Sequence, residues 1–208
     1  MSTSEQWPGN RLEAAEAEAD ESDGQADGTD ETAAPELHLA GHAPGGIDFP
    51  DGVELVTGEP RSTLRGVGIV VARFNGEVTN KLLEASLAEL DRLGVARESV
   101  TVMAVPGAFE LPLGAMALAK TRRFAAIVAL GCVIRGETAH FDYVAGEAAS
   151  GLQLAALETG VPVAFGVLTT ETLDQALARV DYGAEAVRTV LEMADVFSAL
   201  RSTAQAAR

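Results

Sequence analysis

The sequence contains one cysteine, two lysines and only 5% aromatic residues. Cys132 alone cannot form an internal disulfide, which fits a reducing compartment. Lys81 and Lys120 both fall within predicted helices, far from the strand ends where a site would form, so Schiff-base catalysis through lysine is excluded. No apolar stretch approaches the roughly 18 residues of a membrane span, and no segment resembles a signal peptide. We therefore expect a soluble, cytoplasmic protein.

Basic residues are also scarce, with 15 Lys and Arg against 31 Asp and Glu in 208 residues. Residues 1–40 hold eleven acids and one base, a net charge of −10, so 41–208 carry only the remaining −6. Such a balance argues against nucleic acid as a partner, because phosphate backbones are bound by clustered Lys and Arg. Residues 1–60 are predicted to be an acidic, mostly disordered extension of a catalytic domain at 61–208.

Histidines are also few, with three in the whole chain. His38 and His42 are four residues apart, a spacing that would place them on one face of a helix. Gly41, Pro44 and the following glycines argue against a helix there, so we predict no metal site. Cofactor motifs are absent too: Gly66-Val67-Gly68 precedes a strand instead of following one, unlike a dinucleotide-binding fingerprint.

After residue 65, short apolar runs typical of buried strands alternate regularly with segments whose apolar residues recur at helical spacing. Strands are predicted at Gly68–Phe74, Ser99–Val105, Phe124–Leu130 and Pro162–Leu168. Helices are predicted at Glu77–Leu93, Phe109–Arg122, Tyr143–Thr159 and Leu173–Ala199. This order predicts a doubly wound, flavodoxin-like α/β domain with a parallel four-stranded sheet and helices on both faces.

Chemistry-bearing residues are concentrated after the third predicted strand. His140, the only histidine of the folded region, suits proton transfer near neutral pH. Gly136-Glu137-Thr138 offers backbone amides and a hydroxyl near a helix start, which suits an anion such as phosphate, although an ordinary capping turn has the same pattern. Cys132 is either a nucleophile activated by His140 or a small packing residue, and its apolar neighbours favour packing.

Four ordered motifs resemble a known family. They are Arg73-Phe74-Asn75, Val105 to Pro112, Gly131 to Val144, and Phe165 to Thr170. Together they closely resemble the lumazine synthase family of riboflavin biosynthesis, over about 66–200. The resemblance implies condensation of 5-amino-6-(D-ribitylamino)uracil with 3,4-dihydroxy-2-butanone 4-phosphate, giving 6,7-dimethyl-8-ribityllumazine, phosphate and water. It implies no cofactor.

The resemblance also assigns roles to residues. His140 would move protons, and Glu137, Thr138 and Arg179 would hold phosphate. The pyrimidine and its ribityl chain would be bound by Phe74, Ala108, Phe109, Glu110, the main chain of Cys132, Val133 and Ile134, and Phe165. Phe165 and Arg179 would come from the neighbouring subunit, because the family's sites lie between subunits of a pentamer.

One departure from the family follows Arg179. The family usually has a loop with glycine and lysine there, whereas this chain reads Val180 to Glu185 without the lysine and several residues shorter. The departure predicts lower phosphate affinity and leaves open whether pentamers assemble into a sixty-subunit shell. A different class of function, a non-catalytic flavin- or lumazine-binding module, would need neither His140 nor a phosphate site.

Overall fold

The computed structural model describes residues 47–62 and 65–206. Residues 1–46, which make up most of the predicted disordered extension and include His38 and His42, lie outside these ranges, and the boundary near residue 60 stays a prediction. No helix in the two described ranges is long and apolar enough to cross a membrane.

Four parallel strands form the sheet, in the order β2-β1-β3-β4. Their bounds are β1 Gly66–Ala72, β2 Val100–Val105, β3 Phe124–Ile134 and β4 Val163–Thr170. Because the chain moves from β1 to one neighbour and then to the other, the winding reverses beside β1. This order is the flavodoxin-like one, so the predicted fold class is confirmed.

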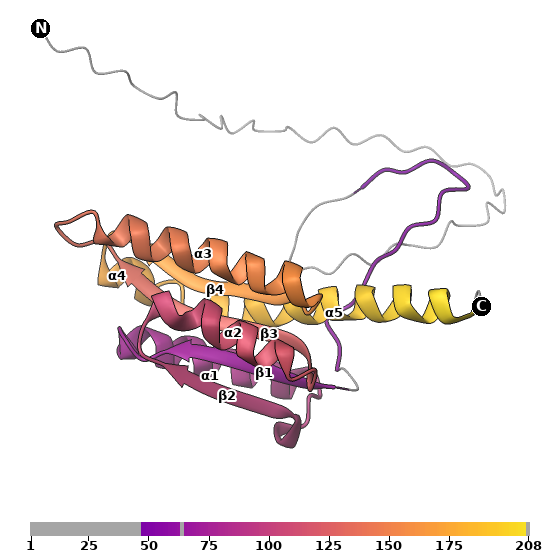
Figure 1. The fold of residues 1–208 in the computed structure, drawn as a ribbon, viewed down its shortest axis with the longest axis horizontal. Helices are drawn as coiled ribbons and strands as arrows, with labels where there is room; N and C mark the ends of the chain where they lie inside the picture. The colour runs from indigo at the N-terminus through magenta and orange to yellow at the C-terminus, as the bar shows by residue number, and fades with distance from the viewer. Residues whose placement is uncertain (1–46, 63–64, 207–208) are drawn as a thin grey trace, which may run out of the picture. The chain divides into compact units, whose positions relative to one another are not determined.

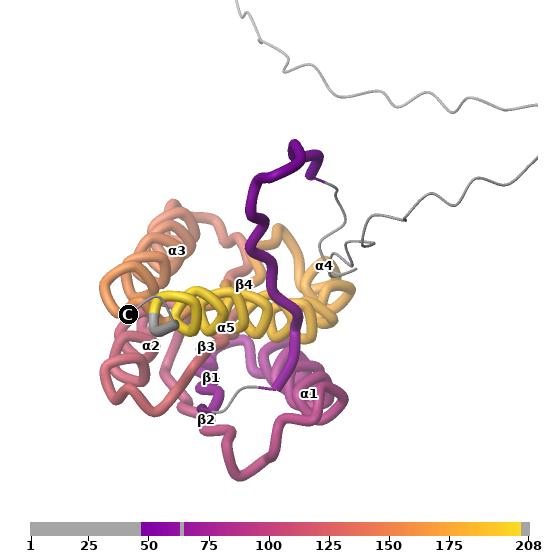
Figure 2. The backbone as a smooth tube through the Cα atoms, turned by 90° about the vertical axis from the view of Figure 1, so that its right-hand side faces the viewer, coloured from indigo at the N-terminus to yellow at the C-terminus, as the bar shows by residue number. Residues whose placement is uncertain are grey.

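Helices cover both faces of the sheet (Figure 1). α2 Leu111–Lys120 and α3 His140–Thr159 pack on one face, and α1 Gly76–Arg92 and α5 Tyr182–Ala206 pack on the other (Figure 2). Short elements complete the chain: η1 Arg97–Ser99, η2 Ala108–Glu110 and α4 Leu173–Leu177.

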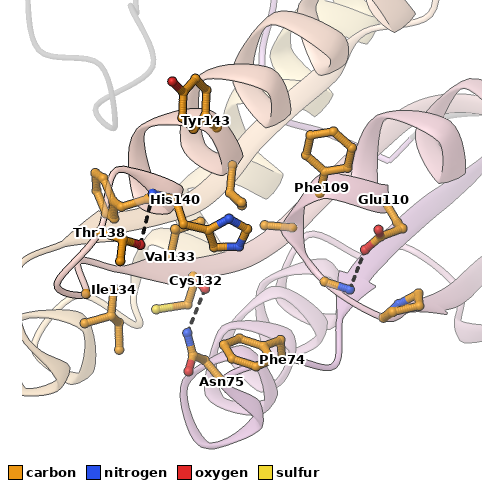
Figure 3. Close-up of a pocket in the computed structure, with 16 residues that line it drawn as sticks. Phe74, Asn75, Phe109, Glu110, Cys132, Val133, Ile134, Thr138, His140 and Tyr143 are labelled. Atoms are coloured by element: carbon orange, nitrogen blue, oxygen red, sulfur yellow. Dashed lines mark hydrogen bonds between the residues drawn. The ribbon is translucent and has the colours of Figure 1, made fainter.

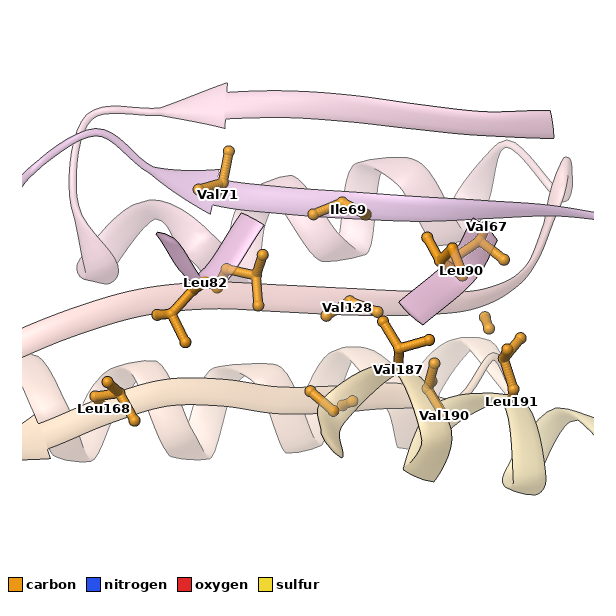
Figure 4. Packing of buried hydrophobic residues seen from close by; sticks show 14 of the residues in the cluster. Val67, Ile69, Val71, Leu82, Leu90, Val128, Leu168, Val187, Val190 and Leu191 are labelled. Atoms are coloured by element: carbon orange, nitrogen blue, oxygen red, sulfur yellow. The ribbon is translucent and has the colours of Figure 1, made fainter. Parts of the chain in front are cut away.

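Successive side chains of a strand point to opposite faces of the sheet, and this divides the core into two apolar clusters. In β1, Val67, Ile69 and Val71 face α1 and α5, whereas Val70 and Ala72 face α2. Figure 4 shows the first cluster, in which Leu82 and Leu90 of α1 and Val187, Val190 and Leu191 of α5 meet the sheet. Both faces of β1 and β3 are therefore buried, as a continuous run of Val, Ile and Ala predicts.

Most predicted element boundaries differ from the structure by one or two residues, and three larger differences bear on the site. The strand predicted to end at Leu130 continues to Ile134, because β4 pairs with β3 as far as Thr170. The next helix begins at His140, three residues before the predicted Tyr143. The long final helix is two helices, α4 and α5, and residues 182–185 of the predicted loop already belong to α5.

The arm before β1, residues 47–62, contacts the domain through polar groups near its end and not through its exposed apolar residues. Ile47, Phe49 and Val53 are exposed, so they are not its docking residues in the single chain. Instead, Glu59 N donates to Asp195 Oδ2 at 3.1 Å, and Arg61 pairs with the same carboxylate at 2.8 Å. Gly58 lies so close to α5 that a Cβ there would overlap the carbonyl oxygen of Glu192.

Candidate active site

A pocket of about 680 Å³ opens at the carboxyl ends of β1, β2 and β3. This is the place where the winding of the sheet reverses, and ligands of doubly wound folds bind at such switch points. Its volume is in the range of small-molecule sites. The lining residues are Phe74, Asn75, Pro106, Gly107, Ala108, Phe109, Glu110, Cys132, Val133, Ile134, Gly136, Thr138, His140, Phe141, Tyr143 and Val144.

Phe74 and Asn75 line the pocket at the end of β1. The Phe74 ring is 70% exposed, which leaves its face available for stacking on a planar ligand. Asn75 adopts a left-handed backbone conformation, with φ 57°, and its Nδ2 donates to Cys132 O at 2.9 Å (Figure 3). Asn75 thereby links the ends of β1 and β3.

The turn between β2 and α2 supplies a carboxylate. Glu110 Oε2 accepts a hydrogen bond from Gly107 N at 2.9 Å, which fixes the carboxylate in the pocket lining (Figure 3). Ala108 is buried beneath it, and Phe109 is 54% exposed. The orientation leaves Glu110 acceptor capacity for ligand hydroxyl groups.

The loop between β3 and α3 has backbone amides available to a ligand. Within the described residues, the amides of Gly136, Glu137 and Thr138 donate no hydrogen bond, whereas Thr138 Oγ1 accepts from His140 N at 3.4 Å. Unsatisfied amides beside a helix start bind anions well. Gly136 and Thr138 line the pocket, but Glu137 does not.

His140 is the first residue of α3, not a loop residue, and it is exposed. Figure 3 shows its imidazole directed toward the space above Phe74 and Asn75. This position brings an imidazole and a loop with open amides to the same pocket as Phe74, although Phe74 and His140 are far apart in the sequence.

Cys132 belongs to β3, and it packs in the core cluster that α1 and α5 form with the sheet. Only 3% of its surface is exposed. Burial raises the pKa of the thiol to about 11, so it is protonated near neutral pH and is a poor nucleophile. The burial of Cys132 therefore favours the packing role over the nucleophile alternative.

A first prediction follows from that burial. Cys132→Ser and Cys132→Ala should both keep turnover within about threefold of the original rate, since the thiol is a packing group. The serine variant should be the less stable of the two, because it buries a hydroxyl. Steady-state rates and thermal unfolding measure both effects. An inactive but folded Cys132→Ser protein would instead show that sulfur takes part in the chemistry.

Two predicted site residues do not reach the pocket of their own chain. Phe165 pairs with Ala129 in mid-strand and lies five positions before Thr170, the end of β4. That spacing is roughly 16 Å at the rise of a strand. Arg179 follows α4, where its Nη1 donates to Gln175 O at 2.8 Å. Neither residue is among those lining the pocket.

Sequence reasoning missed several lining residues. Asn75 and Tyr143 were quoted only within motifs, and Phe141 and Val144 received no role. A signal for Asn75 was present, because asparagine is one of the few residues that tolerate the left-handed conformation and it directly follows a strand. Tyr143 and Val144 lie one turn after His140 and face the same side of α3, which became apparent only once α3 was seen to start at His140.

These features define a flavodoxin-like α/β protein whose pocket, at the switch point of the sheet, is lined by aromatic rings, open backbone amides and a histidine. A model of the 6,7-dimethyl-8-ribityllumazine synthase family matches residues 65–198. Proteins of that name from Yersinia pestis (strain Pestoides F) and Yersinia pseudotuberculosis serotype O:1b (strain IP 31758) are each 52% identical over 141 residues. The matches cover 65% of this chain and 90% of each relative. The chain therefore belongs to the 6,7-dimethyl-8-ribityllumazine synthase family, whose transferases act in riboflavin biosynthesis.

Proposed function

We propose that the pocket condenses 5-amino-6-(D-ribitylamino)uracil with 3,4-dihydroxy-2-butanone 4-phosphate. The observation that carries this proposal is the convergence of Phe74, Glu110, the open amides of 136–138 and His140 on one pocket. Phe74 stacks on the pyrimidine, Glu110 and Ala108 bind the ribityl chain, and the main chain of β3 reads the uracil edge.

The reaction needs a proton-transfer group beside an anion site. The substrate's 5-amino group attacks the ketone and forms an imine with loss of water. Phosphate is then eliminated, and the ribitylamino nitrogen closes the second ring with loss of another water. His140 moves protons, and the amides of the β3–α3 loop hold phosphate as it departs. Since the substrate provides the amine, neither Lys81 nor Lys120 is required, and neither lines the pocket.

We further infer that the working site lies between subunits of a homo-oligomer, a pentamer by likeness to the family. Phe165 is 46% exposed on β4 and Arg179 is exposed after α4, so both are available to a neighbouring copy. In this assembly Phe165 covers the pyrimidine and Arg179 pairs with phosphate, for which a guanidinium is well shaped. Cytoplasmic location stays a prediction, and the assembly of pentamers into a sixty-subunit shell stays open.

The direct test mixes the protein with both substrates and follows lumazine fluorescence against the uncatalysed rate. A rate above buffer supports the enzyme. No gain over buffer would favour the non-catalytic binding module, which the orientation of His140 into the pocket argues against.

Replacement of His140 gives a second prediction. His140→Ala should slow turnover by less than the roughly 100-fold typical of acid–base groups, because amine and ketone already react in water and orientation supplies much of the acceleration. Substrate affinities should barely change. Glu147→Ala, on the exposed side of the same helix, is the matched control. Complete loss of activity in a folded His140→Ala assembly would show that the imidazole does more than transfer protons.

A further inference from the structure

The guanidinium of Arg135 joins three elements at the base of the β3–α3 loop. Its Nε donates to Glu171 Oε1 at 3.0 Å, just after β4, and its Nη2 pairs with Asp142 Oδ1 at 3.1 Å in the first turn of α3. It also lies 4.0 Å above the centre of the Phe141 ring. Through its backbone, Arg135 N donates to Thr170 O at 2.9 Å.

These contacts fix both stems of the loop that carries the open amides. Arg135 is the first residue after β3, and Asp142 and Phe141 follow the loop in α3. Phe141 and His140 are adjacent and both line the pocket, whereas Arg135 does not. Between the stems, Gly136 and Glu137 have no hydrogen bond within the described residues, so their position depends on the stems.

The charge of Arg135 is already matched by carboxylates. Asp142 first, and then Glu171, raise the pKa of the Arg135 guanidinium by accepting its hydrogen bonds. Two carboxylates and one guanidinium leave this cluster with a net charge of −1, which repels phosphate instead of attracting it. Direct capture of phosphate by Arg135 is therefore disfavoured.

We propose that Arg135 is a positioning residue, which clamps the loop at 135–139 so that its amides meet the phosphate of the substrate. The inference rests on the proposed function, since it names the residue that orders the proposed phosphate site. The clamp acts through the loop and touches neither substrate.

Arg135→Gln should raise the KM for the phosphate-bearing substrate by about tenfold, well within the loss that an ångström of misplacement can cause. The KM for the pyrimidine should stay unchanged, because Phe74 and Glu110 are held by other contacts. Arg97→Gln is the matched control: it also loses an arginine–aspartate pair, with Asp91, but away from the pocket. An equal rise in both KM values would overturn the proposal by indicating general damage.

Glu171→Asp separates the clamp from direct phosphate contact, because the shorter side chain weakens the contact with Arg135 Nε while the net charge of the cluster stays the same. If Arg135 were a phosphate ligand, loss of the Glu171 contact would release the guanidinium and tighten phosphate binding. The clamp predicts the opposite, a weaker binding of several-fold, because the loop stem is loosened. Inorganic phosphate, titrated into each variant and followed by ³¹P NMR, measures this without any turnover. Tighter phosphate binding by Glu171→Asp would sink the proposal.

The two hypotheses fail in different ways. A wild-type protein that makes no lumazine contradicts the proposed function, whereas phosphate titration of the wild type and Arg135→Gln still tests the clamp. If wild type is active and Arg135→Gln binds phosphate and the phosphate-bearing substrate normally, the clamp is wrong and the function stands.

Discussion

Mixed assemblies of Arg179→Ala and His140→Ala chains should be more active than the average of the two parents. Each variant alone places one defect in every pocket. If the site takes Arg179 from a neighbour, an equal mixture puts an intact His140 beside an intact Arg179 at roughly a quarter of the interfaces, because head-to-tail contacts join different surfaces of adjacent subunits. Activity should therefore approach about a quarter of wild type.

The physical reason is the placement of Arg179 in the single chain. It does not line the pocket that contains His140, and within the described residues its guanidinium donates one hydrogen bond, from Nη1 to Gln175 O in the preceding turn. Its guanidinium is exposed and has remaining donors for a ligand held by another subunit.

The chain offers a matched control for this experiment. Phe165 and Arg179 are both proposed to be donated to the neighbour's pocket, so a mixture of Phe165→Ala and Arg179→Ala restores no pocket. His140→Ala mixed with Phe165→Ala should gain activity. Differential tagging and native mass spectrometry first confirm that subunits have mixed. Mixed rings without any gain for Arg179→Ala plus His140→Ala would place both residues in the pocket of one subunit.

Gly183→Ala should destabilise the domain by about 3 kcal/mol, at the upper end of the usual cost of overpacking. Gly183 is the second residue of α5 and is buried where α5 meets α1. A Cβ at Gly183 would overlap the carbonyl oxygen of Leu82 and lie 2.9 Å from Ser86 Oγ. Ser86 Oγ in turn donates to Leu82 O at 2.8 Å and to Gly183 O at 2.9 Å.

The clash cannot be relieved cheaply, because the nearest atom belongs to the backbone of α1. Separating the helices would break the Ser86 contact to Gly183 and loosen the core around Leu82. We expect the apparent Tm to fall by roughly 6–12 °C for a chain of this size.

Gly146→Ala is the control for the glycine change. Gly146 lies inside α3, is exposed and has no atom within 4 Å of an added Cβ. Alanine there should stabilise the helix by roughly 0.5–1 kcal/mol. Equal stabilities of Gly183→Ala and Gly146→Ala in urea titration would mean that α1 and α5 pack less closely than the structure has them.

Much of the site could be predicted because parallel strands present their carboxyl ends at one edge. The runs ending near Phe74, Val105 and Leu130 follow from local composition, and the edge rule then places Phe74, Glu110 and His140 together. The resemblance to the family could be found in the same way, since each of the four motifs is a short continuous stretch of the sequence. These predictions depend on which residues follow each strand, and the sequence contains that information directly.

The sequence by itself therefore determined the order of strands and helices, the α/β class and most of the pocket lining. Only the tertiary structure decided that β3 continues through Cys132 to Ile134, because pairing with β4 extends it. In that extension the Cys132 thiol lies in the core, and the Cys132 carbonyl oxygen accepts the hydrogen bond from Asn75 Nδ2. Tertiary packing likewise excluded Phe165 and Arg179 from their own chain's pocket, since the path of β4 and α4 depends on contacts between distant residues. Composition and periodicity describe neighbours along the chain, and these positions depend on neighbours in space.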